Sequence, residues 1–228
     1  MTVISPKNPY TAMQYNQYLH GTNNHENHNG NVDYWDILLK PVKENVAYWE
    51  NKKALDFGCG KGRNVHNLLS LTDKWSCVDG VDISPANIEH CKRLDLTKSN
   101  FQTTNGVSAG SAPNDYYDFV MSTIVFQHIC VYDIRDLILK DIYRVLNPKG
   151  IFSFQMGFGP KETGFAQYYD NVLNAYGTNG LCDVRVSDTT QIVNHLTAIG
   201  FKNVQTFIKP SYDDNGHPNW IYTIACKG

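Results

Sequence analysis

The chain lacks any long apolar segment. No run of eighteen apolar residues occurs in its 228 residues, and residues 1–10 do not show the basic and then apolar pattern of a secretory signal peptide. A membrane-spanning helix and a secreted protein are therefore not expected. We expect a cytoplasmic protein of one domain, because its 42% of hydrophobic residues suffice for a sizeable core.

An excess of charge of one sign is also lacking. The chain has 20 Lys and Arg against 22 Asp and Glu, a net charge of −2, and no basic stripe. Binding to long nucleic acid or to a membrane surface depends on such a stripe, so neither partner is expected. Nothing in the sequence indicates the oligomeric state.

Cysteine pairs with the spacing of metal sites are absent. The six cysteines are scattered without a Cys-x-x-Cys pair, which indicates free thiols in a reducing compartment. His20, His25 and His28 lie in an Asn-rich polar stretch with no cysteine or carboxylate cluster beside them, so we interpret them as part of a solvated loop. No metal site is predicted.

What the chain does have is a glycine-rich turn between a strand pattern and a helix pattern. Ala54-Leu55 is followed by Asp56, by glycines at 58, 60 and 62, and by the apolar helix start Val65-His66-Asn67-Leu68-Leu69. This order opens a nucleotide-binding unit of the Rossmann type, where glycine lets a ligand approach the main chain. The dinucleotide spacing Gly-x-Gly-x-x-Gly does not fit, and a tight turn with no ligand is the alternative interpretation.

A second acid follows at the expected distance. Asp82 ends the strand pattern Ser76-Cys77-Val78-Asp79-Gly80-Val81, 20 positions after Gly62. A carboxylate at this place accepts hydrogen bonds from ribose hydroxyls. Ser84 and Pro85 are a good N-cap and first helical residue, so a helix is predicted over about residues 85–93.

Strand and helix patterns then alternate to the end of the chain. Further strands are predicted at 101–104, 117–122, 151–156, 201–208 and 220–226, and helices at 133–146 and 189–199. Turn residues at 213–218 indicate that the last two strands form an antiparallel pair. We therefore predict an α/β fold: a Rossmann-like, doubly wound, seven-stranded and mostly parallel sheet with a reversed last strand, preceded by an N-terminal helical leader over residues 1–50.

This arrangement resembles the class I S-adenosylmethionine (SAM)-dependent methyltransferases over about residues 51–228. The resemblance rests on Asp56 with its three glycines, on Gly80-Val81-Asp82-Ile83-Ser84, and on Leu146-Asn147-Pro148-Lys149-Gly150 between a helix and a strand. It implies a SAM-binding domain at 51–228, with SAM as methyl donor and S-adenosylhomocysteine (SAH) as product.

The resemblance also implies where SAM binds. In this family the glycine loop packs under the methionine part of SAM, and the acid before the loop acts on the amino group. The end of the third strand contacts adenine; Asn105 stands there in place of the family's usual Asp. The residues expected to bind the cofactor are Asp56, Gly58, Cys59, Gly60, Asp82, Ile83, Asn105, Gly106 and Ser122.

The least regular segments are expected to determine the acceptor. The resemblance implies that residues 157–187 are an insertion that shapes the acceptor site, and that residues 1–50 fold over the SAM pocket. His128, after the fourth strand, is the candidate general base, because an unperturbed histidine titrates near neutral pH. Packing alone is the alternative for each aromatic candidate, namely Tyr15, Tyr18, Tyr34, Phe158, Phe165, Tyr168, Tyr169 and Tyr176.

We predict from these features a SAM-dependent methyltransferase with a small-molecule acceptor. Two other functions stay open: a SAM-binding protein of the same fold with non-methyl-transfer chemistry, and a non-catalytic regulator. The intact glycine loop and Asp82 favour an enzyme. The glycine spacing disfavours a dehydrogenase that uses NAD.

Overall fold

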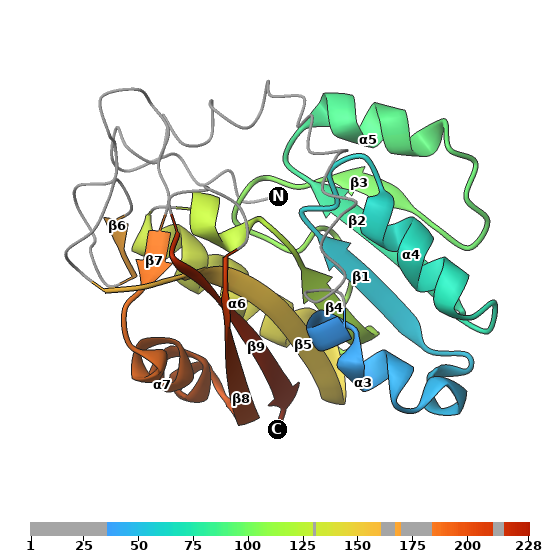
Figure 1. Cartoon of the computed structure of the whole chain (residues 1–228). Helices are drawn as coiled ribbons and strands as arrows, with labels where there is room; N and C mark the ends of the chain where they lie inside the picture. The colour runs from blue at the N-terminus through green and yellow to red at the C-terminus, as the bar shows by residue number, and fades with distance from the viewer. Residues whose placement is uncertain (1–35, 130, 161–166, 170–183, 212–216) are drawn as a thin grey trace.

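The computed structural model describes residues 36–129, 131–160, 167–169, 184–211 and 217–228. A central sheet lies between helices on both of its faces (Figure 1). Its strands follow the order β3-β2-β1-β4-β5, and β9 and then β8 continue the sheet beyond β5. The predicted doubly wound α/β fold is confirmed.

The first five strands run parallel. They are β1 (Lys53–Phe57), β2 (Cys77–Asp82), β3 (Phe101–Thr103), β4 (Tyr117–Ser122) and β5 (Leu146–Phe158). The start of β5 differs from the prediction, because Leu146 already pairs with Tyr117 of β4. The register between the two strands shifts beyond this pair, and such an irregularity accommodates Pro148 within the strand.

The last strand is reversed, as predicted. β9 (Asn219–Lys227) pairs antiparallel with β5 from Ile151–Cys226 to Phe158–Asn219. β8 (Phe201–Pro210) pairs antiparallel with the other edge of β9. Two short strands, β6 (Gln167–Tyr168) and β7 (Val184–Val186), were not predicted. β7 pairs with Gly157 and Phe158 of β5, on the edge opposite β9.

The helices begin and end close to the predicted residues. They are α4 (Arg63–Leu71), α5 (Pro85–Lys92), α6 (Tyr132–Val145) and α7 (Thr189–Ile199). The Ser84 hydroxyl caps α5 by accepting from the Asn87 amide, and Asp188 caps α7. Gly200, with φ of 123°, ends α7. No helix among the described residues is long and apolar enough to cross a membrane.

The sheet has an apolar core on each face. Leu55 and Phe57 of β1 point to one face, where Phe152 and Phe154 of β5 pack with α6 and α7. Ala54 belongs to the opposite core, which contains Trp49, Trp75, Phe119 and the buried residues of α4. Because side chains alternate along a strand, Asp56 faces α4. The polar side chain of Asp56 is thus directed into a buried, mostly apolar layer.

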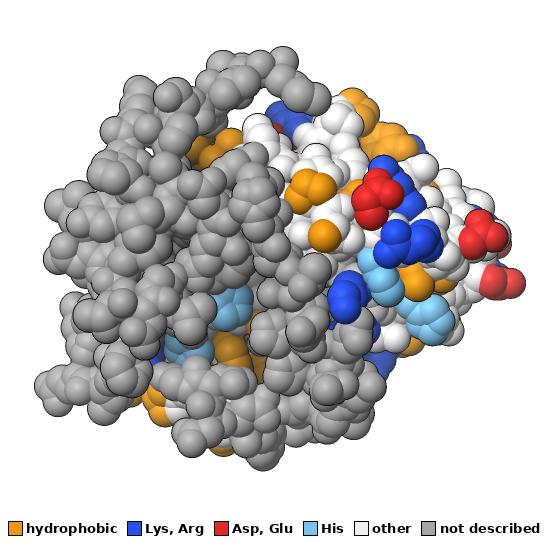
Figure 2. Space-filling view, turned by 90° about the horizontal axis from the view of Figure 1, so that it is seen from above, with side chains coloured by type: hydrophobic (Ala, Val, Ile, Leu, Met, Phe, Trp, Pro, Cys, Tyr) orange, Lys and Arg blue, Asp and Glu red, His pale blue; other side chains and the backbone are white. Residues whose placement is uncertain are grey.

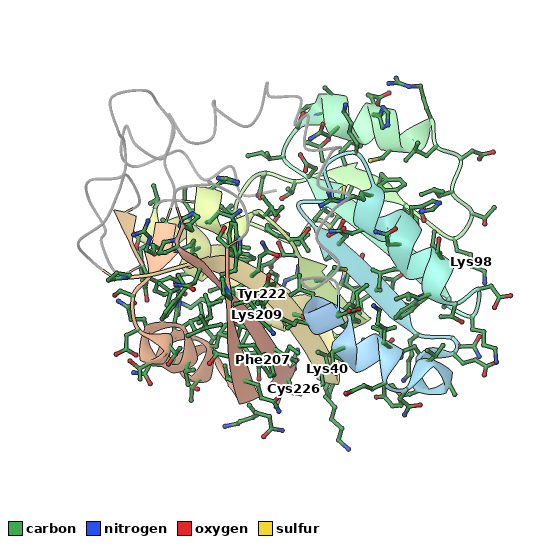
Figure 3. The ribbon with its side chains drawn as sticks, viewed as in Figure 1. Lys40, Lys98, Phe207, Lys209, Tyr222 and Cys226 are labelled. Atoms are coloured by element: carbon green, nitrogen blue, oxygen red, sulfur yellow. The ribbon has the colours of Figure 1, made fainter. Side chains whose placement is uncertain are left out.

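The segment before β1 packs against the part of the sheet that contains β4, β5, β8 and β9. It contains α3 (Lys40–Lys43) and the short 3-10 helix η2 (Val46–Trp49). The backbone oxygen of Leu38 accepts a 2.8 Å hydrogen bond from Ser153 of β5. The Lys40 ammonium lies 5.7 Å from the centre of the Phe207 ring of β8, and Tyr222 of β9 lies nearby (Figure 3). Leu38 and Lys40 therefore dock on β5 and β8, whereas Trp49 packs against Phe119 of β4 and Trp75.

Several predicted features fall outside the described residues. They are the helical pattern at residues 13–19 and the side chains of Tyr15, Tyr18, Tyr34, Phe165, Tyr168 and Tyr176. The division of the chain at residue 50 and the boundaries of the 157–187 insertion stay predictions.

Candidate active site

The carboxyl ends of the parallel strands meet at one edge of the sheet, which is where open α/β sheets bind ligands. Figure 2 views the molecule from this side. In the described part, Lys and Arg side chains, with Asp or Glu side chains among them, lie on the side of α4 and α5, and His side chains are seen both there and nearer the middle of the view. The glycine loop, Asp56 and Asp82 all lie at this edge, because they end β1 and β2.

The glycine loop has a backbone that only glycine adopts readily. Gly58, Gly60 and Gly62 have φ of 75°, 52° and 88°. The amides of Gly58 and Cys59 both donate to the carbonyl oxygen of Val81, at 2.8 and 2.9 Å. A Cβ on Gly58 would lie 2.2 Å from Val125, whereas a Cβ on Gly60 would meet no atom within 4 Å. Protein atoms therefore fill the space next to Gly58, whereas the space next to Gly60 is open.

Asp82 is tied to both the loop and α5. Its Oδ2 accepts from the Gly60 amide at 2.9 Å, and its Oδ1 accepts from the Ser84 amide at 2.8 Å and from Asn87 at 3.3 Å. Burial raises the pKa of this carboxyl, and the three hydrogen bonds oppose that rise. A carboxylate accepts about four hydrogen bonds, so Asp82 retains capacity for a hydroxyl donor.

Asp56 is fully buried. Its Oδ1 accepts a long, 3.4 Å hydrogen bond from Asn64 of α4, and Asn64 donates at 2.7 Å to the Thr123 hydroxyl. Burial is the main cause that raises the pKa of Asp56 from 3.8 to about 7, with the Asn64 hydrogen bond and the charge of Arg63 acting against it. Asp56 Oδ2 and Asn64 Oδ1 have no hydrogen-bond partner among the described residues. A buried oxygen that accepts no hydrogen bond is unfavourable, so Asp56 Oδ2 and Asn64 Oδ1 could both accept from a bound donor group.

Two thiols line the inner side of the loop. Cys91 of α5 donates to the carbonyl oxygen of Gly60 at 3.2 Å, and Cys59 does so at 3.7 Å. The contact with Cys91 and burial raise the pKa of the Cys59 thiol, so Cys59 serves as a packing group behind the loop.

The remaining predicted cofactor residues are bonded within the protein. The Asn105 side-chain oxygen accepts from the Val107 amide at 3.1 Å and from Ser108 at 2.8 Å, so both of its lone pairs are already used. Gly106 has φ of 81° in the same turn. The Ser122 hydroxyl donates to the Phe57 carbonyl at 2.8 Å, and Ile83 is half-buried. Their contacts with a cofactor stay predictions.

Together these features fit SAM. An ammonium group supplies N–H donors that the oxygens of Asp56 and Asn64 lack. A ribose hydroxyl matches the remaining capacity of Asp82, and Gly60 leaves open space where any other residue would place a side chain. A pyrophosphate would instead require free amides, but the amides of Gly58, Cys59 and Gly60 are already used.

Comparison with known proteins agrees with this fit. Residues 55–154, from β1 to β5, match a family described as a methyltransferase domain. The chain is 26% identical over 203 residues to an uncharacterized methyltransferase of Schizosaccharomyces pombe, a match that covers 86% of this chain and 77% of that protein. These matches support a class I SAM-dependent methyltransferase.

Solved structures have the same fold. A SAM-dependent methyltransferase from Methanosarcina mazei superposes with a TM-score of 0.60 at 18% identity, covering 80% of this chain and 96% of that one. A phosphoethanolamine N-methyltransferase from Haemonchus contortus, solved with phosphomonomethylethanolamine and SAH, gives a TM-score of 0.59 at 14% identity. That match covers 85% of this methyltransferase and 56% of the other chain.

The candidate base of the methyltransferase, His128, lies in the 3-10 helix η3 (Phe126–His128), directly after β4. Its Nε2 lies 3.4 Å from the side-chain nitrogen of Gln127. Gln127 itself is buried, and its side-chain oxygen has no partner among the described residues. The prediction that His128 acts as a base stays a prediction. No metal-binding group of three or more His, Cys, Asp or Glu side chains occurs in the described ranges.

Sequence reasoning missed Asn64, Gln155 and His217. Met121 pairs with Ser153 and Ser122 pairs with Phe154 across β4 and β5, so Gln155 lies just beyond the last pair, on the same face as Ser153. Gln155 is 3% exposed, and its side-chain oxygen has no partner in the described part. The ring of buried His217 occupies the space above Gly157, where a Cβ would lie 2.2 Å from it. A lone Gln inside the apolar run of residues 151–156 was the available signal.

Two aromatic candidates of the 157–187 insertion are described. Phe158 is half-buried and packs against the core beside α6 and α7. Tyr169 is 2% exposed, and its hydroxyl lies 2.7 Å from His195 of α7. Neither side chain is arranged as a free base.

Proposed function

We propose that this SAM-dependent methyltransferase acts on a small molecule whose methylated group lies near an N–H or O–H donor. The observation that supports this is the burial of the polar side chains at the carboxyl ends of β4 and β5. Gln127, Gln155 and His217 are exposed by only 1, 3 and 4%. Polar groups buried in this way suit a small acceptor better than a protein surface or a nucleic acid strand.

Asp56, Asp82 and the glycine loop would hold SAM. The Asp56 carboxyl, with Asn64, would accept from the amino group, and Asp82 would accept from the ribose. Bound SAM supplies a methyl group on a positively charged sulfur, which is already an activated leaving group. What the protein contributes is therefore alignment of the acceptor, which supplies up to roughly 7–11 kcal/mol in the best cases.

The acceptor side is characterised by hydrogen-bond acceptors that lack donors. The side-chain oxygens of Gln127 and Gln155 have no partner among the described residues. Each would be satisfied by an amine or hydroxyl hydrogen of the acceptor. His128 would remove a proton only if the methylated group must lose one during transfer.

Binding of SAH by calorimetry, with NAD as the control ligand, tests the cofactor site. We expect micromolar affinity for SAH, a loss of roughly tenfold or more in Asp82→Ala from the lost charge-assisted hydrogen bonds, and no binding of NAD. The matched control is Glu89→Gln, which removes an exposed carboxylate from α5. Failure of the folded protein to bind SAH would overturn the site.

Release of SAH during incubation with SAM and panels of amines, alcohols and phenols tests the acceptor. Turnover by one class, reduced in Gln155→Leu with unchanged SAH affinity, would support the proposal. Turnover only with protein or nucleic acid would refute it. SAH binding without turnover of any acceptor would favour the alternative, a SAM-binding protein with another chemistry or a regulatory role.

A cytoplasmic location is also proposed. Cys59, Cys77, Cys91 and Cys226 are free thiols in the described residues, as expected in a reducing compartment. Fractionation of the source cells would test it.

A further inference from the structure

A fully buried arginine connects three parts of the acceptor side. Arg135 of α6 is 0% exposed. One terminal nitrogen of its guanidinium donates to the carbonyl oxygen of Ile129, directly after His128, and the other donates to the carbonyl oxygen of Tyr169. Its guanidinium carbon also lies 4.8 Å from the centre of the Tyr169 ring. Arg135 thus bridges the loop after β4 and the 167–169 segment.

A hydrogen-bonded chain continues from Tyr169. Its hydroxyl lies 2.7 Å from His195 Nδ1, and His195 Nε2 lies 3.0 Å from Asp136 Oδ1. A carboxylate only accepts, so His195 Nε2 carries the hydrogen and Nδ1 accepts from the Tyr169 hydroxyl. Asp136 follows Arg135 on α6, so the chain returns to the helix where it began.

The charges around His195 come from few groups. Asp136 accepts from Lys140 at 2.7 Å, and Arg135 lies on the same helix. Tyr132 stacks on the His195 ring at 5.0 Å, and Tyr169 lies at its other nitrogen. These five groups, on α6 and in the 167–169 segment, are the titratable and charged ones that the described residues place against it.

Such a network is costly to bury. Removing the charge of Arg135 from water costs several kcal/mol, and an apolar replacement of similar size is often as stable. A role in stability alone therefore explains this network poorly. Its contacts instead fix two backbone carbonyl groups, one beside His128 and one within the insertion.

We propose that Arg135, Tyr169, His195 and Asp136 are positioning residues, which hold the loop after His128 and the 167–169 segment in place for the acceptor. The inference rests on the proposed role of the 157–187 insertion in acceptor binding. Tyr169 acts through its hydrogen bond to His195, and not as a base. The hydrogen bonds shown for Asp56 and Asp82 in the described part of the chain come from other residues.

Hydrogen exchange of Tyr169→Phe tests the coupling without any acceptor. The amide of Tyr169 donates to Arg185 at 3.0 Å, and that of Ile129 to Phe126 at 3.2 Å. Loss of the hydroxyl leaves His195 Nδ1 unsatisfied, so we expect exchange of both amides to rise roughly fivefold or more. Arg135→Met should raise both further, and Arg135→Lys should restore them in part. Tyr143→Phe, on α6 beside Phe201, is the matched control and should change neither.

Acceptor kinetics separate positioning from stability. With an acceptor from the panels, Tyr169→Phe should raise the acceptor KM about threefold or more, with the SAH Kd within about twofold of wild type, since one neutral hydrogen bond is lost. If no acceptor is found, the exchange result alone decides. A fall in melting temperature with unchanged amide exchange or unchanged acceptor KM would overturn the inference. Lost SAH binding in the wild type would instead refute the proposed function.

Discussion

Replacing Asp56 with Asn should stabilise the ligand-free methyltransferase while weakening its hold on SAH. Asp56 is fully buried, and burial raises its pKa from 3.8 to about 7. At about pH 8 the folded protein must therefore keep an ionised carboxylate in a site that disfavours the charge. An amide of the same shape can accept from Asn64 as the carboxylate does, and it carries no charge.

The magnitude follows from the pKa difference. About 3 pKa units at 1.36 kcal/mol each give about 4 kcal/mol as the upper limit of the destabilisation by Asp56. The raised pKa means that the folded state binds more protons than the unfolded state between about pH 4 and 7. Below about pH 4 the carboxyl is protonated in both states, and burying it carries no charge penalty. The protein therefore loses stability as the pH rises from about 4 through about 7. The gain from Asp56→Asn should grow over the same interval.

Urea unfolding at several pH values measures this effect, and calorimetry with SAH measures the functional loss. Without the charge, the ammonium of SAH loses a charge-assisted hydrogen bond, so its Kd should rise roughly ten- to hundredfold. Glu89→Gln should change neither quantity. Equal stabilities of Asp56→Asn and wild type at both about pH 5 and about pH 8 would refute the desolvation argument.

Three further predictions concern the loop, a helix cap and the buried histidine. Gly58→Ala should lower the unfolding free energy by about 2 kcal/mol or more, because its Cβ would lie 2.2 Å from Val125. Adding Val125→Ala should recover part of this loss in urea unfolding. No recovery would mean that the loss comes from the positive φ of Gly58 and not from the contact with Val125. Ser84→Ala should lower the unfolding free energy by about 1 kcal/mol with little change in SAH affinity, because the Ser84 amide still donates to Asp82; a large loss of affinity would contradict this. Burial is the main cause that lowers the pKa of His195 below its usual 6.5, so the unfolded chain binds this proton first and stability falls as the pH drops below about 6.5. His195→Gln should flatten that part of the pH–stability curve, and an unchanged slope would count against the assignment.

Local signals predicted most of the secondary structure. Ser84-Pro85 marks a helix start by capping chemistry that depends on adjacent residues, and the structure bears this out. The start of β5 was less accessible, because pairing with β4 extends a strand through Pro148, where local propensity predicts a loop. The short strands β6 and β7 were missed for the same reason, since a few residues become a strand only through their partners.

The sequence by itself determined the glycine loop, the acids at positions 56 and 82 and the reversed final strand, because each depends on spacing along the chain or on the chemistry of adjacent residues. Only the tertiary structure decided which polar groups meet. Strand register brings Gln155 of β5 next to the end of β4, and Arg135 bonds to Tyr169, 34 positions away in the chain. Burial also raises the pKa of Asp56 to about 7, and burial is a property of the packed layers around a residue. Contacts between distant segments follow from packing in three dimensions, which no local pattern records.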